Sequence, residues 1–242
     1  PKKHILKTGN LFRLFDKQII KEHFIYGKYI LLGSVLNSVY NNFFNLFINY
    51  KFNIKSLAIL ERSKTYSEMF SSVFGLSVSK VIYPKLCVIN DKKSLEVTIT
   101  KYLISGIVLF IPITVLISLI IEDAIKLIYN EEWWDVIPYL KYLILCSFLS
   151  VSAILIQIIF RVENQNFKSF KNEIVKKIFI ISIIIGSSSF GIDTVIYSLG
   201  IGIIVSFLIN LYFVNKFISI SLYEIVKKTI IPIIVSFSMY FS

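Results

Sequence analysis

The stretch Met69–Lys85, MFSSVFGLSVSKVIYPK, decides how this chain is built. It is apolar and long enough for most of a transmembrane helix, yet Lys80 lies inside it and Pro84 near its end. A lysine at the centre of a spanning helix costs about 2.5–3.5 kcal/mol on insertion scales, so it usually faces a water-filled interior and marks a substrate pathway. The alternative is that Lys80 snorkels to the near membrane surface, since Lys85 lies only about 7.5 Å further along a helix.

The composition of the whole chain, like that of this stretch, is typical of a membrane protein. Of 242 residues, 55% are hydrophobic and only 17% are charged, and the mean hydropathy is +0.72. The apolar residues form long uncharged blocks, which is typical of an all-α, polytopic transmembrane helical bundle. The net charge of +11 is a poor sign of nucleic-acid binding, because no long basic stretch lies outside the apolar blocks. The chain opens at Pro1 with neither Met nor a signal peptide, which is expected of a fragment of a longer protein.

The cysteines and histidines, which most often bind metals, do not have the spacing of a metal site here. Cys87 and Cys146 lie far apart in or beside apolar runs and are expected to pack as small hydrophobic side chains. His4 and His23 are isolated. We therefore expect no metal, no cofactor and no catalytic residues.

The first expected span, Phe24–Tyr50, carries a stripe of amides. Asn37, Asn41, Asn45 and Asn49 recur every fourth residue, and positions four apart stack on one helix face. An amide in hydrocarbon needs a partner, so the stripe must face other helices or water. It therefore predicts either interhelical hydrogen bonds or a hydrophilic lumen that offers donors and acceptors to a polar solute.

The chain divides into a cytoplasmic amphipathic or linker segment, residues 1–23, and a bundle of seven spans, residues 24–242. Apolar periodicity in the first segment fits a helix on the membrane surface, and a solvated linker is the alternative. Lys51–Glu68 is expected to be a loop, and no Asp or Glu is expected inside a span. The expected spans after the first are Met69–Ile89, Tyr102–Ile121, Tyr142–Phe160, Ile174–Gly186, Thr194–Val214 and a half-length span from Thr229 to Ser242.

Lysine and arginine counts predict the orientation of the bundle. Alternate segments carry nineteen on one side and six on the other, with Lys80 inside the membrane. The richer side is expected to be cytoplasmic, which puts the N-terminus inside. The outer segment then contains Glu131, Glu132 and the pair Trp133-Trp134, for which interfacial anchoring is expected rather than acid–base catalysis.

Four stretches together resemble a known family of transporters. They are Val39–Ile48 followed by Lys51-Phe52; Arg62, Ser71-Ser72 and Ser79–Pro84; Glu131–Pro138; and Glu173–Lys177. In order and spacing they are similar to the polysaccharide-transporter branch of the multidrug/oligosaccharidyl-lipid/polysaccharide (MOP) exporters. That branch contains the O-antigen and lipopolysaccharide repeat-unit flippases of the Wzx kind. The resemblance covers roughly residues 24–177, and more loosely the rest.

The resemblance implies fold and function together. The full protein would have fourteen helices in two bundles, this chain being the seventh to a truncated thirteenth, with the N-terminal half as its missing partner. It would flip an undecaprenyl-diphosphate-linked oligosaccharide across the bacterial inner membrane by alternating access. Asn37, Asn41 and Asn45 would line the path of the sugar, and Lys80 would bind the diphosphate. Replacing Lys80 with Gln would then abolish export.

Other classes of protein remain open at this point. A related efflux transporter of small molecules would usually carry acidic residues inside its helices for ion coupling. A membrane-embedded polymerase or glycosyltransferase would be an enzyme with a long external catalytic loop. A seven-helix receptor or structural subunit would need a complete seventh span.

Overall fold

The computed structural model describes residues 17–241, and over this range the chain is helical and contains no strand. The helices are α1 (Lys17–Lys51), α2 (Ile54–Val88), α3 (Lys92–Ile128), α4 (Ile137–Cys146), α5 (Phe148–Val162), α6 (Asn166–Ser187), α7 (Ile192–Val214) and α8 (Leu222–Phe241). Two short 3₁₀ turns, η2 (Glu131–Val136) and η3 (Ser188–Phe190), lie between them. The all-α prediction is confirmed. The surface segment expected at the N-terminus lies mostly outside the described residues.

Short capped turns connect the long helices. Asn53 caps α2 by accepting a hydrogen bond from the Ser56 amide at 2.7 Å. Asp91 caps α3 by accepting from the Ser94 amide at 2.8 Å. Gly191, with φ of 105°, ends the Ser-rich turn between α6 and α7. Because each of these connections has only a few residues, consecutive helices must run antiparallel.

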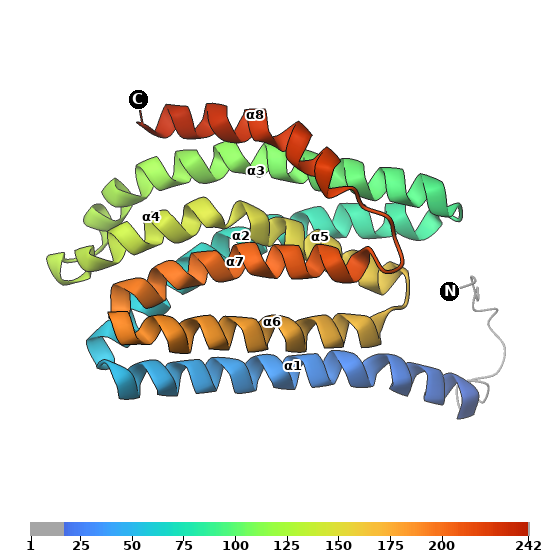
Figure 1. Cartoon of the computed structure of the whole chain (residues 1–242), viewed down its shortest axis with the longest axis horizontal. Helices are drawn as coiled ribbons and strands as arrows, with labels where there is room; N and C mark the ends of the chain where they lie inside the picture. The colour runs from blue at the N-terminus through green and yellow to red at the C-terminus, as the bar shows by residue number, and fades with distance from the viewer. Residues whose placement is uncertain (1–16, 242) are drawn as a thin grey trace.

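The helices therefore lie side by side along one axis, with α1 beside α6 and α3 beside α8 (Figure 1). The connections 89–91, 163–165 and 215–221 lie at the end of the bundle where α1 begins. We call this the basic end, because it is the side that carries most of the lysines in the sequence count. The connections 52–53, 129–136 and 188–191 lie at the opposite end. The connections between the long helices therefore alternate between the two ends of the bundle.

The inside and outside of the bundle are both apolar. On α3, residues at helical spacing from Leu95 to Ile111 are buried against Ile156 and Phe160 of α5. Large apolar side chains also cover the outside, for example Leu46, Leu116 and Ile234. A surface of this kind is what a bilayer stabilises and water does not, so the chain is a membrane protein.

Only some of the helices are long and apolar enough to cross a membrane. In the described part, α3 with 37 residues and α7 with 23 residues qualify alone. The segment Glu131–Cys146 and α5 qualify together as one span bent by 44°. The other long helices carry charged or amide side chains in their central parts. These two or three candidates are fewer than the seven spans that were expected.

Three expected boundaries are wrong. Residues 54–68, expected as a loop, form the first half of α2, where the small side chains of Ser63 and Ser67 are buried against other helices. Residues 166–173, expected to lie ahead of the span Ile174–Gly186, form the start of α6. The half-length seventh span is a helix of 20 residues, about 30 Å long, because it begins at Leu222 rather than Thr229. In each case charged residues that were expected to lie in a loop lie on a helix.

Candidate functional site: a polar cavity at mid-height of the bundle

A cavity of about 560 Å³ lies between α1, α2, α4, α5, α6 and α7, and we call it the central cavity. Most of the residues that line it lie close to the midpoints of their helices, not at their ends. Its polar lining consists of Asn37, Tyr40, Asn41, Lys64, Ser67, Glu68, Ser71, Ser72, Ser150, Gln157, Lys176, Lys177 and Ser206. Its volume lies in the range of ligand-binding sites, about 300–1,000 Å³.

The amide stripe of α1 contributes one wall. Asn37 and Asn41 line the central cavity, and both are exposed, so the cavity is open on the side of α1. Asn45, one turn further along, does not line it. Asn45 is half-buried, and its Oδ1 has no hydrogen-bond partner among the described residues. Two of the three predicted amides therefore meet at this cavity.

Lysines on the facing helices contribute the charge. Of the described lining residues, three are lysines, Lys64, Lys176 and Lys177, and one is a carboxylate, Glu68. The side chain of Lys64 lies 3.7 Å from Glu61 Oε1, and its Nζ lies 5.0 Å from the centre of the Phe44 ring. The lining is therefore cationic as a whole.

Lys176 is neutralised by a local network. It is 7% exposed, and its Nζ lies 2.5 Å from Glu173 Oε1. The same oxygen accepts a hydrogen bond from Gln157 Nε2 of α5 at 3.3 Å. This network ties α6 to α5 and holds one face of the cavity in place.

Lys177 is in a different situation from its neighbour. Its Nζ lies 3.9 Å from the centre of the ring of Tyr40, a cation–π contact between α6 and α1. No described carboxylate lies within ion-pair distance of it. Lys177 is half-buried at the midpoint of α6, so it brings a cation without an ion-pair partner to the centre of the bundle.

Lys80 lies away from this cavity. It is exposed, and it does not line the central cavity. It lies nine residues beyond Ser71 on α2, about 13.5 Å nearer the basic end. The structure therefore does not bring Lys80 together with the amides of α1, and its position fits the snorkelling alternative.

Sequence reasoning missed the lysines of α6 because they belong to a basic cluster that resembles a loop. One signal was available in KNEIVKK, residues 171–177. Glu173 and Lys177 are four residues apart, as in a helix with charges on one face. The same spacing relates Asn172 to Lys176, so the motif was compatible with a helix.

A comparison with known protein families finds a match over the N-terminal half of the chain. The sequence model of a family described as polysaccharide biosynthesis protein matches residues 10–138, which is more than half of the chain. The match includes α1, α2 and α3, and hence two walls of the central cavity. No curated protein and no solved structure matches the chain. The chain belongs to the polysaccharide biosynthesis protein family.

Proposed function

We propose that the protein is a flippase that moves lipid-linked oligosaccharide repeat units, with undecaprenyl diphosphate as carrier, across the bacterial inner membrane. Membership of the polysaccharide biosynthesis protein family supports the class of cargo. The central cavity supports the route, because it is polar and cationic at mid-height of a bundle whose outside is apolar.

The observation that carries this proposal is the position of Lys177. A diphosphate that crosses the membrane needs a cation at membrane depth, since its charge is otherwise too costly in hydrocarbon. A lysine already paired with a carboxylate would have to break that pair to bind phosphate. Lys177 rests on Tyr40 instead, so its ammonium group is free to form the stronger charge-assisted contact.

The remaining lining suits an oligosaccharide. Asn37, Asn41, Ser72 and Gln157 offer amide and hydroxyl groups to sugar hydroxyls. The lipid tail would stay in the bilayer through the open side of the cavity next to α1. A second bundle, the N-terminal half of the same transporter, would close the cavity from that side and rock against this one. In this arrangement the start of α1 is cytoplasmic.

Complementation tests the proposal. In a strain that lacks its own copy of the gene, Lys177→Gln is expected to reduce surface polysaccharide at least tenfold. Lys80→Gln, which removes the same charge outside the central cavity, is expected to retain export. Lys177→Arg, which keeps the charge, should restore part of it. Normal export by Lys177→Gln at equal protein level would show that this lysine does not carry the diphosphate.

One observation favours a second candidate, an ion-coupled exporter of small molecules. Glu68 lines the central cavity, and Glu173 on α6 pairs with Lys176 of the same lining. Such residues can bind the coupling ion in an efflux transporter. In that case Glu68→Gln would abolish efflux of a cationic dye, and surface polysaccharide would be unchanged.

A further inference from the structure

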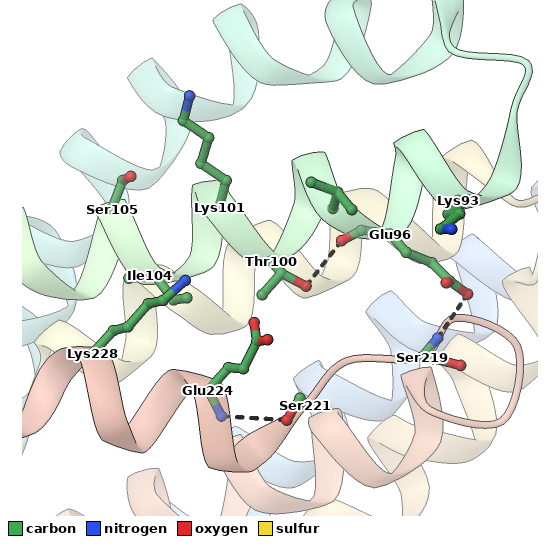
Figure 2. A pocket seen from close by; sticks show the side chains of 11 residues that line it. Lys93, Glu96, Thr100, Lys101, Ile104, Ser105, Ser219, Ser221, Glu224 and Lys228 are labelled. Atoms are coloured by element: carbon green, nitrogen blue, oxygen red, sulfur yellow. Dashed lines mark hydrogen bonds between the residues drawn. The ribbon is translucent and has the colours of Figure 1, made fainter.

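A second cavity, of about 690 Å³, lies between the first halves of α3 and α8 at the basic end (Figure 2). It shares no lining residue with the central cavity. Its polar lining consists of Lys93, Glu96, Thr100, Lys101, Ser105, Ser219, Ser221, Glu224 and Lys228. We call it the α3–α8 cavity.

The charged groups of this cavity are of both signs, and most have no partner. Lys93, Lys101, Lys228 and Glu224 are exposed and form no ion pair with any described side chain. Glu96 is occupied on one oxygen, because its Oε1 accepts a hydrogen bond from the Ser219 amide at 3.0 Å. Figure 2 shows Glu224 and Lys228 projecting from α8 into the space in front of α3.

The faces that line the cavity continue along both helices as exposed apolar stripes. On α3, Lys101 and Ser105 are followed at helical spacing by Leu109, Leu116 and Ile120, all exposed. On α8, Glu224 and Lys228 are followed in the same way by Ile231 and Val235. Both helices begin at the basic end and run in the same direction (Figure 1). A charged recess at the end of the bundle therefore leads into an apolar surface toward its middle.

We propose that the α3–α8 cavity binds the headgroup of a phospholipid that carries both a phosphate and a primary ammonium, as in phosphatidylethanolamine. The lysines would bind the phosphate, and Glu224 would accept hydrogen bonds from the ammonium. The acyl chains would follow the apolar stripes of α3 and α8. A purely anionic headgroup would meet the unpaired carboxylate of Glu224, and a choline headgroup has no N–H to donate to it.

This lipid site is independent of the proposed transport pathway. It would join α8 to α3 at the membrane surface, and it would make the stability of the protein depend on the lipid supplied. A lipid that binds the folded protein and not the unfolded one raises the midpoint of thermal unfolding by mass action.

The test is thermal unfolding of the purified, delipidated protein with added phosphatidylethanolamine, phosphatidylglycerol or phosphatidylcholine. Phosphatidylethanolamine is expected to raise the midpoint most. Combining Lys93→Gln, Lys101→Gln and Lys228→Gln should weaken its apparent affinity at least tenfold. The matched control combines Lys85→Gln, Lys171→Gln and Lys216→Gln, which removes the same charge outside the cavity and should leave the affinity unchanged.

A single variant distinguishes recognition of the ammonium from recognition of the phosphate. Glu224→Gln keeps the lysines, so it should lose the preference for phosphatidylethanolamine over phosphatidylglycerol while still binding both. Equal stabilisation of the unmodified protein by phosphatidylcholine, or by inorganic phosphate, would overturn the proposal. An equal loss in the control triple variant, or an unchanged preference in Glu224→Gln, would also overturn it.

Discussion

At the scale of single residues, function depends on which charges have partners. Lys176 and Lys177 are neighbours in sequence, yet one is paired with Glu173 and the other rests on Tyr40. Successive side chains on a helix point about 100° apart, so these two lysines have different surroundings. The sequence identified Asn37 and Asn41 from their spacing alone. It could not identify Lys177, because the partner of a lysine depends on tertiary packing between α6 and α1.

The ring of Tyr40 should matter to transport through its face and not through its hydroxyl. Tyr40→Leu removes a cation–π contact worth about 0.5–2 kcal/mol, which corresponds to about a 2- to 30-fold loss. Tyr40→Phe keeps the aromatic face and should keep most of the activity. The measurement is the rate of lipid-linked oligosaccharide transport in proteoliposomes. Equal losses in both variants would point to the hydroxyl instead.

The cap of α3 predicts a pH dependence of stability. The hydroxyl of Ser94, and then its amide, donate to Asp91 and hold the pKa of that carboxyl below its ordinary value near 3.8. A lowered pKa stabilises the fold above the ordinary value, and this contribution is lost as the pH falls through the lowered pKa. The unfolding midpoint of Asp91→Ala should therefore lie below that of the unmodified protein at neutral pH. The gap should close in acid, and a gap that persists at the lowest pH would contradict this account.

At the scale of elements, the sequence predicted the number of long helices better than their ends. Periodicity and apolar blocks located the helices from α1 to α8, and the bent pair α4–α5 appears where one span was expected. The errors at residues 54–68 and 166–173 have one cause. Charged residues were assigned to loops, although in a bundle with a polar cavity a charged residue can lie in mid-helix. Hydropathy does not distinguish a charged residue in a loop from one in the middle of a helix.

Close packing of α4 against α7 depends on Gly200. A Cβ at this position would lie 2.2 Å from the Tyr142 hydroxyl oxygen and 2.5 Å from its ring. The ring would have to move and give up its hydrogen bond to the Tyr197 carbonyl at 2.9 Å. We expect Gly200→Ala to lower the free energy of unfolding by about 1–3 kcal/mol.

The control for this prediction lies on the same helix. A Cβ at Gly202 would lie 3.6 Å from Ile180, an ordinary contact. Gly202→Ala should be neutral, or stabilising by up to about 1 kcal/mol, because alanine has the higher helix propensity. Chemical unfolding in detergent measures both variants, and an equal loss in the two would contradict the packing argument.

At the scale of the whole molecule, the lysine and arginine counts predicted which end of the bundle is cytoplasmic, and this orientation stays a prediction. The same counts placed Lys176 and Lys177 in a cytoplasmic segment, because lysine and arginine counts do not report depth in the membrane. Depth comes from the assembled bundle, where residues from α1, α2, α4, α5, α6 and α7 meet at mid-height. The central cavity is a property of this assembly, and no single segment of the sequence contains it.

The most direct test of the central claim is the accessibility of α1 to water at mid-height. Asn41 faces the central cavity, and Val39 lies two residues away on the opposite face of the same helix, 60% exposed. Each is replaced by Cys in protein that carries Cys87→Ser and Cys146→Ser, and is treated in membranes with a charged, membrane-impermeant thiol reagent. The account predicts that Asn41→Cys reacts at least tenfold faster than Val39→Cys, and that lipid-linked oligosaccharide slows its reaction. Equal rates at the two positions would contradict a water-filled path at the centre of the bundle.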